Sequence, residues 1–235
     1  MATATATVRD RTKAQGKVTS RGGGAVVLHR VPYEVFDQLC QEPANRFLRM
    51  TYRDGTLEIM SPIGYEHENT SEWFGMIIRA VTSELGITCK GVGSAMFHRA
   101  GPRPLKGHGK QPDRCYYIAN ASRMYGKKKA DMAAGDPPPD LWIEVDDRGS
   151  SRKRFPIFAA LGVPELWRYR VKSKKLEFFG LQGAVYQPIE RSQALPMLTP
   201  ALVLEAFALG SDGDESLWDR SLRAWVREKF VHQPG

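Results

Sequence analysis

Residues 141–145 read Leu141-Trp142-Ile143-Glu144-Val145, a nearly continuous apolar run with one carboxylate inside it. Such a run is typical of a strand that is buried on both faces of a sheet. Burying an unpaired carboxylate is costly, so Glu144 needs a cation, a hydrogen-bond network or a position at the sheet edge. Asp146 follows two residues later, on the same face of the predicted strand. The segment therefore predicts a buried strand that carries an acidic centre.

Helix and strand patterns alternate on both sides of this strand. Arg53-Asp54-Gly55 separates two apolar runs, 47–52 and 56–60, and its Asp-Gly pair predicts a tight β-hairpin turn. Apolar residues recur at helical spacing over 31–39 and 66–85. Further strands are predicted at 87–90, 95–99, 113–118, 164–170, 175–179 and 184–186, a loop at 101–110, and helices at 150–161 and 215–230. This order predicts an α/β fold with a central mixed β-sheet flanked by helices, an N-terminal hairpin and a C-terminal helix.

Residues 1–24 differ in composition from the remainder of the chain. They offer too little apolar surface to offset the entropy lost on ordering. They contain five basic residues and the single acid Asp10, and so carry half of the formal net charge of +8. We predict a disordered basic tail over 1–24 and a single, mildly basic domain over 25–235.

Other bulk properties narrow the cellular context. No apolar run reaches the length of a membrane span, and the N-terminus lacks the apolar stretch of a secretory signal. Cys40, Cys89 and Cys115 are far apart and odd in number, which predicts free thiols in a reducing cytosol. The pI of about 9.5 favours a polyanionic partner. We therefore expect a cytoplasmic protein with nucleic acid as its partner and no membrane association; the sequence leaves a homodimer open.

A second acid stands at the start of another predicted strand. Asp113 directly follows Pro112, and Asp113 and Glu144 on neighbouring strands can hold a hard cation through their oxygen atoms. Such a cation can bind a phosphate oxygen, lower the pKa of a bound water and stabilise the leaving oxygen. The basic run Arg152-Lys153-Arg154 begins the following helix and can orient water or bind the phosphate. The residues therefore predict a metal-assisted phosphodiesterase centre.

An ordered set of segments resembles the PD-(D/E)XK nuclease superfamily. The motif is carried by Gln111-Pro112-Asp113 with Cys115-Tyr116-Tyr117, and then by residues 139–146. Within the superfamily the chain is similar to a bacterial group of restriction-endonuclease-like proteins called the Uma-two family. Residues 55–62, 67–68 and 156–169 extend the resemblance, which spans 31–207. The Pro-Asp motif alone is short, but the long ordered set is specific.

This resemblance implies a restriction-endonuclease-like core with a divalent cation, Mg²⁺ or Mn²⁺, at its acidic centre. Asp113 matches the first acid of the motif and Glu144 the second, with Asp146 assisting them at the metal. The superfamily's lysine normally lies two residues after the second acid, where this chain has Asp146. In the Uma-two family the lysine lies on the next helix, at a position that aligns with Arg154, and Lys153 stands beside it.

Three further features qualify this implied site. Glu68 lies on the first long helix, where the superfamily often supplies another acid, although a solvated helix start explains it equally well. Gln111 replaces the acid expected before the proline and removes one metal ligand or base. Arg154 keeps the positive charge of a lysine, but a guanidinium is a poor proton acceptor. The implied site thus retains its two principal acids and lacks its usual base.

Each of these residues also has a plainer interpretation. Asp113 fits a turn aspartate after proline, and Glu144 fits an edge glutamate that pairs with an arginine. The run 152–154 fits a solvated helix start. Cations at a helix N-terminus nevertheless oppose the helix dipole, which favours a phosphate or a carboxylate neighbour there.

Three functions are compatible with this pattern. The first is a divalent-metal-dependent endonuclease that hydrolyses phosphodiester bonds in DNA. The second is a catalytically decayed nuclease fold that serves as a nucleic-acid-binding module, which Gln111 and Arg154 favour. The third is an interaction protein without a nucleic-acid role, because half of the net charge lies in the predicted tail.

Overall fold

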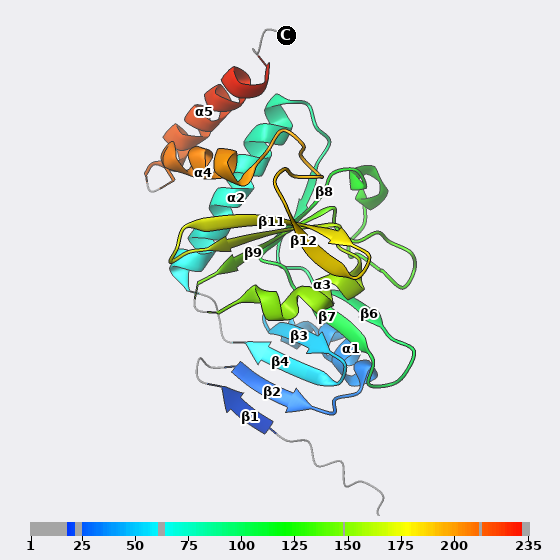
Figure 1. Cartoon of the computed structure of the whole chain (residues 1–235). Helices are drawn as coiled ribbons and strands as arrows, with labels where there is room; N and C mark the ends of the chain where they lie inside the picture. The colour runs from blue at the N-terminus through cyan, green and yellow to red at the C-terminus, as the bar shows by residue number, and fades with distance from the viewer. Residues whose placement is uncertain (1–17, 22–24, 61–63, 148, 212, 232–235) are drawn as a thin grey trace, which may run out of the picture.

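Two β-sheets make up the framework of the molecule. The computed structural model describes residues 18–21, 25–60, 64–147, 149–211 and 213–231, whose strands form two six-stranded sheets (Figure 1). The first sheet is antiparallel, in the order β1 (Val18–Arg21), β2 (Ala25–His29), β4 (Thr56–Met60), β3 (Arg49–Arg53), β7 (Gly107–Lys110) and β6 (Phe97–Ala100). The second sheet is mixed, in the order β12 (Val185–Ile189), β11 (Lys175–Gln182), β10 (Glu165–Arg170), β9 (Leu141–Asp146), β8 (Arg114–Tyr117) and β5 (Lys90–Val92). Its parallel pair is β9 and β10.

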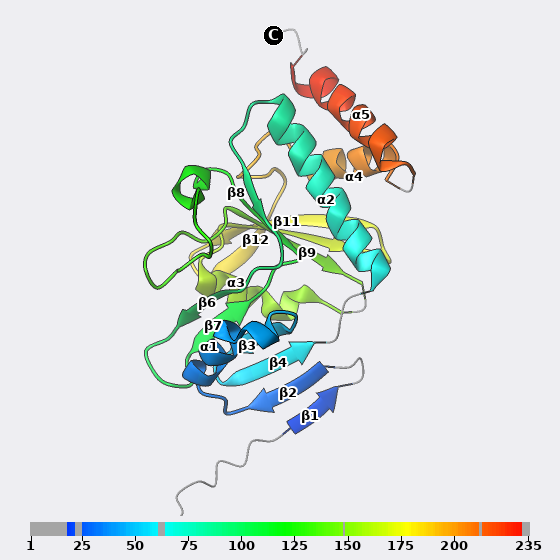
Figure 2. The same cartoon turned by 180° about the vertical axis from the view of Figure 1, so that it is seen from behind.

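Helices cover both sheets and fill the space between them. The described α-helices are α1 (Tyr33–Gln41), α2 (Tyr65–Glu84), α3 (Phe155–Leu161), α4 (Pro200–Ala208) and α5 (Glu215–Val226). Short 3₁₀ turns occupy Pro43–Asn45, Ala121–Met124 and Ser151–Arg154, and a π-helical segment, Arg227–Val231, continues α5. Figures 1 and 2 show α2, α4 and α5 on one side of the second sheet and α3 between the two sheets. Among the described residues, no helix is long and apolar enough to cross a membrane.

Strand β9 lies at the centre of the second sheet and separates two apolar clusters. Leu141, Ile143 and Val145 pack with α2, whereas Trp142 packs with α3. Because side chains alternate across a strand, Glu144 points to the same side as Trp142. The carboxylate predicted from the sequence therefore faces the space between the two sheets.

The α/β class and the main predicted elements are confirmed. The predicted helices over 31–39 and 66–85 correspond to α1 and α2, and the predicted hairpin corresponds to β3 and β4. Asp54 and Gly55 at its turn both have positive φ, 44° and 85°, as a type I′ turn requires. The hairpin belongs, however, to a separate antiparallel sheet and not to a margin of one central sheet.

The prediction of a loop over 101–110 was wrong at its end, where β7 forms. Glycine has a low strand propensity, so Gly107-His108-Gly109-Lys110 does not look like a strand in the sequence. The structure shows why a glycine is needed there: a Cβ on Gly109 would lie 2.5 Å from Cζ of the buried Phe36 on α1. The close approach of α1 to the sheet therefore explains why this strand contains a glycine at position 109 and looks like a loop in the sequence.

Two other differences concern the ends of the chain. Helix α4 was not predicted, because Leu202-Val203-Leu204 gives an apolar run without a clear helical face. Strand β1 lies within the predicted tail and pairs with β2. The rest of that predicted tail, 1–17 and 22–24, lies outside the described residues.

We expect Gly109→Ala to lower the free energy of unfolding by about 1–3 kcal/mol, because the added methyl group overpacks the contact with Phe36. Gly149→Ala is the matched control, since its Cβ meets nothing within 4 Å and should change stability by less than about 0.5 kcal/mol. Urea unfolding followed by circular dichroism measures both. Equal effects of the two variants would contradict this account of β7.

Candidate active site

A buried ion pair joins the two sheets. Lys110, at the end of β7, places its Nζ 3.1 Å from Oε1 of Glu144 on β9, and the side chains are only 2% and 4% exposed. Lys110 Nζ also donates to the carbonyl oxygen of Gln111 at 2.6 Å, and Trp142 Nε1 donates to Glu144 Oε1 at 2.8 Å. Glu144 thus receives both the cation and the hydrogen bonds that its burial demands.

Burial acts on both partners of this pair. It raises the pKa of the Glu144 carboxyl, and the positive charge of Lys110 opposes that rise. It lowers the pKa of the Lys110 ammonium, and the negative charges of Glu144 and Asp113 oppose that change. The attraction between the partners therefore offsets only part of the desolvation cost, as is usual for ion pairs inside a protein.

Asp113 precedes β8 and is held by three donors. Its Oδ1 accepts from Arg49 Nη2 at 2.6 Å, and its Oδ2 lies 3.1 Å from His67 Nε2. The backbone N–H of Val145 also donates to Oδ2, at 2.7 Å. Burial alone would raise the pKa of Asp113, but the His67 hydrogen bond and the charges of Lys110, His67 and Arg49 hold it well below its usual range. Asp113 is therefore a fixed, ionised carboxylate.

The structure brings Arg154 to this cluster and leaves Lys153 and Glu68 outside it. Arg154 Nη2 lies 3.5 Å from Glu58 Oε2 on β4, and the guanidinium charge acts on Glu144. Lys153 is exposed. The Glu68 side chain is 62% exposed, 3.9 Å from Nδ1 of His67. The cation predicted at this position is thus present and is directed at Glu58.

Both carboxylate oxygens of Asp146 are engaged away from Glu144. Its Oδ2 accepts from Arg168 Nε at 2.6 Å, and its Oδ1 accepts from the backbone N–H of Ser151 at 2.9 Å. Arg168 also donates to Ser150 Oγ and to the Glu177 carboxylate. Asp146 therefore belongs to a hydrogen-bond network that is centred on Arg168 of the neighbouring strand β10. Its carboxylate anchors the turn between β9 and α3, and among the described residues it shares no hydrogen-bond partner with Glu144.

Three contributors to the cluster were missed as site residues: Arg49, Lys110 and His67. Lys110 lies in the segment predicted to be a loop, so no strand pattern indicated that its side chain is buried. Arg49 lies on the predicted hairpin, where a single arginine at a strand start carries no signal. His67 was part of a segment that carried the family resemblance, and nothing else in the sequence pointed to it.

Gln111, which replaces an expected acid, accepts from the backbone N–H of Met50 at 3.0 Å and so ties β3 to the segment after β7.

Comparison with known proteins identifies the family of the chain. Residues 33–211 match the family model Uma2, described as "Putative restriction endonuclease". The chain belongs to the Uma2 family. The matched range includes Arg49, Asp113 and Glu144, and it confirms the resemblance derived from the motifs.

A solved structure is also similar to this Uma2 chain. It is titled a "putative nuclease belonging to DUF820" from Anabaena variabilis, with 14% sequence identity and a TM-score of 0.44. The similarity covers 75% of this chain and 90% of that one. No curated protein matches the chain.

The acids of the cluster fit a hard divalent cation only in part. Mg²⁺ is commonly held by one or two carboxylates together with water and substrate phosphate oxygens, and Asp113 and Glu144 can supply such a pair. The presence of the Lys110 ammonium beside Glu144 shows that these acids require positive charge. Among the described residues, however, no three His, Cys, Asp or Glu side chains are grouped to hold a metal. A two-carboxylate site is compatible with this arrangement, and the predicted third ligand, Asp146, is engaged elsewhere.

We expect Asp146→Ala to lower the free energy of unfolding by about 2–4 kcal/mol, because the buried Arg168 loses its nearest carboxylate and keeps only Glu177 as a charged partner. The double variant Asp146→Leu/Arg168→Leu should recover much of that loss, since it removes both charges. Lys153→Ala, on the exposed start of the same segment, is the control and should be neutral. Urea unfolding measures all three; a loss below about 1 kcal/mol in Asp146→Ala would contradict the structural role.

Proposed function

We propose that the chain is a divalent-metal-dependent endonuclease that hydrolyses phosphodiester bonds in DNA, with Asp113 and Glu144 as ligands of Mg²⁺ or Mn²⁺. One observation carries the proposal: two buried carboxylates from neighbouring strands lie within electrostatic reach of one buried ammonium group, that of Lys110. Burying such a cluster costs free energy. The chain belongs to a family described as restriction endonucleases, which supports a catalytic role for these buried charges.

Each residue of the cluster has a defined task in this proposal. When bound, a divalent cation supplies a Lewis acid for the phosphate and lowers the pKa of water. Arg49 and His67 keep Asp113 ionised at neutral pH and fix its orientation, so its carboxylate would be a hard donor once one of these contacts opens. Lys110 takes the place of the missing motif lysine and orients the attacking water by N–H donation from Nζ. Arg154, which keeps its charge permanently, binds a phosphate oxygen.

Surface charge supports a nucleic-acid substrate. The exposed side chains of Arg152 and Lys153 stand at the start of α3, next to Arg154. Cations in such a row suit the phosphate backbone of DNA, whose binding is driven by charge and weakened by salt. The mildly basic composition of the domain agrees with this choice of substrate.

A second candidate function is nucleic-acid binding without hydrolysis. Both oxygens of Asp113 already accept from donors of the chain itself, and Lys110 already neutralises Glu144. If these partners are never displaced, the nuclease fold serves only to bind. The two candidates differ in whether the chain cleaves DNA, so one assay separates them.

We expect purified full-length protein to cleave DNA in Mg²⁺ or Mn²⁺, and Asp113→Asn and Glu144→Gln to reduce the rate by at least about 100-fold. Both variants keep the shape of the side chain, and circular dichroism checks that they fold. Lys153→Ala is the control and should retain most of the activity. A gel assay on plasmid and linear DNA measures the rates.

Two outcomes of this assay would overturn the proposal. Cleavage that persists unchanged in Asp113→Asn and Glu144→Gln would remove these acids from the site. Salt-sensitive DNA binding by the unaltered protein, with no cleavage in several divalent metals, would favour the binding module. Lys110→Arg keeps the charge beside Glu144 with a different donor geometry, so a rate equal to that of the unaltered protein would remove Lys110 from the water-orienting role.

A further inference from the structure

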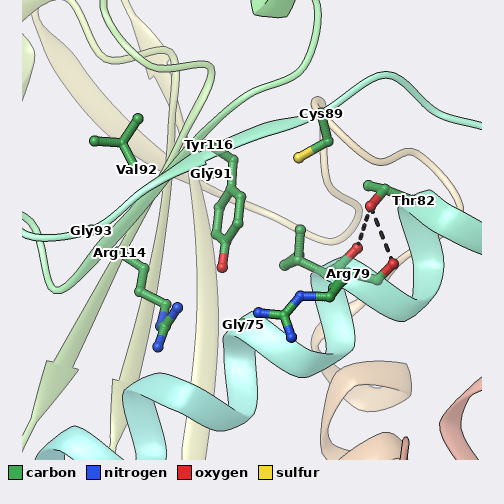
Figure 3. A pocket seen from close by; sticks show the side chains of 10 residues that line it. Gly75, Arg79, Thr82, Cys89, Gly91, Val92, Gly93, Arg114 and Tyr116 are labelled. Carbon is green, nitrogen blue, oxygen red and sulfur yellow. Dashed lines mark hydrogen bonds between the residues drawn. The ribbon is translucent and has the colours of Figure 1, made fainter. Parts of the chain in front are cut away.

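A polar hollow lies on the α2 side of the second sheet, away from the space between the sheets. It has a volume of about 380 Å³ and is lined by α2 and by the β5–β8 edge. Figure 3 shows Arg79 and Arg114 directed toward it from two elements, with Tyr116 between them. Gly75, Gly91 and Gly93 also line it and leave room between the larger side chains.

Tyr116 supplies the observation that points to a ligand. The residue is only 6% exposed, and the proton of its buried hydroxyl has no acceptor within hydrogen-bond distance. Figure 3 shows this hydroxyl pointing into the hollow. Burial raises the pKa of the phenol to about 12, and the nearby Arg114 offsets part of that rise, so the group remains a proton donor. A buried donor without an acceptor is rare in folded proteins and calls for an explanation.

Arg114 is held in position by the residues of α2. Its Nε donates to Ser71 Oγ at 3.2 Å, and its Nη2 pairs with Glu72. Its Nη1 lies 2.7 Å from the position that a Cβ would take on Gly75. Glycine weakens a helix interior relative to alanine, so Gly75 is explained by the room that the guanidinium needs.

The charges of the hollow leave an excess of one cation. Arg79 Nη2 lies 3.9 Å from Glu72 Oε1, and Glu72 also pairs with Arg114, so one carboxylate faces two guanidinium groups. The Arg79 side chain is 64% exposed and can turn toward a ligand. An anion with several acceptor oxygens would satisfy the excess charge and the Tyr116 hydroxyl together.

We infer that Arg79, Arg114 and Tyr116 form a binding site for the phosphate group of a small organic phosphate of nucleotide size. Guanidinium groups match the oxygens of a phosphate in pairs, and the phenol adds a neutral donor. The volume lies within the range of small-molecule sites. The phosphate belongs either to a free mononucleotide or to the 5′ end of a nucleic-acid strand.

This phosphate site is separate from the proposed nuclease site, and phosphate binding can be measured without cleavage. Calorimetric titration of the full chain, with chelator and without divalent metal, uses inorganic phosphate, a 5′-mononucleotide, and a short oligonucleotide with and without its 5′-phosphate. We expect saturable binding of the mononucleotide, and at least tenfold weaker binding by Arg79→Ala and by Tyr116→Phe.

Tyr116→Phe removes a hydroxyl whose proton has no acceptor in the free protein, so it should fold normally, and thermal unfolding checks this. Arg103→Ala, which removes an exposed arginine outside the hollow, is the charge-matched control. Preference for the phosphorylated oligonucleotide over the mononucleotide identifies a strand end, and equal or weaker binding of the oligonucleotide identifies a free nucleotide; either supports the phosphate site. Absence of binding by any probe, unchanged binding in Arg79→Ala and Tyr116→Phe, or an equal loss in Arg103→Ala would overturn it.

Discussion

The buried ion pair between Lys110 and Glu144 is the interaction on which the rest of the structure depends. It connects the last residue of β7 in the first sheet with the middle of β9 in the second. Asp113 makes a parallel connection, because it accepts from Arg49 of the first sheet and from the backbone of Val145 in the second. These charges join the two sheets in addition to the apolar contact between Phe97 on β6 and Trp142 on β9. An apolar contact of similar volume would join them at no greater cost, so stability alone does not account for the charges, whereas the proposed catalytic role does.

The balance of charge in this space decides what the cluster can do. Asp113 and Glu144 face Arg49, Lys110 and Arg154, and Glu58 takes part of the Arg154 charge. Hydrolysis requires that part of this internal neutralisation gives way to a metal ion and a phosphate. A protein that only binds nucleic acid requires that these charges continue to neutralise one another. The same residues thus serve either function, and the difference lies in whether their mutual contacts open.

The burial of the two acids was predictable from the sequence in part because local patterns carried them: Glu144 interrupts an apolar strand, and Asp113 follows a proline at a strand start. Arg154 was distinguished from Arg152 and Lys153 only by the family resemblance. Lys110 was not predictable, because its strand is rich in glycine to admit Phe36, and its partner lies in the other sheet. The role of Asp146 was not predictable either, since Arg168 reaches it only through the parallel pairing of β9 with β10. Local chemistry was thus visible in the sequence, whereas the pairing of charges across strands was not.

The most direct test of the central claim is a crystal of the protein soaked in Mn²⁺ and measured at a wavelength where manganese scatters anomalously. The account predicts one principal manganese peak, bonded to carboxylate oxygens of Asp113 and Glu144, with the Lys110 ammonium moved away from Glu144 Oε1. A principal peak bonded to other residues, or no peak at this pair in saturating Mn²⁺ with the Lys110–Glu144 contact intact, would contradict it.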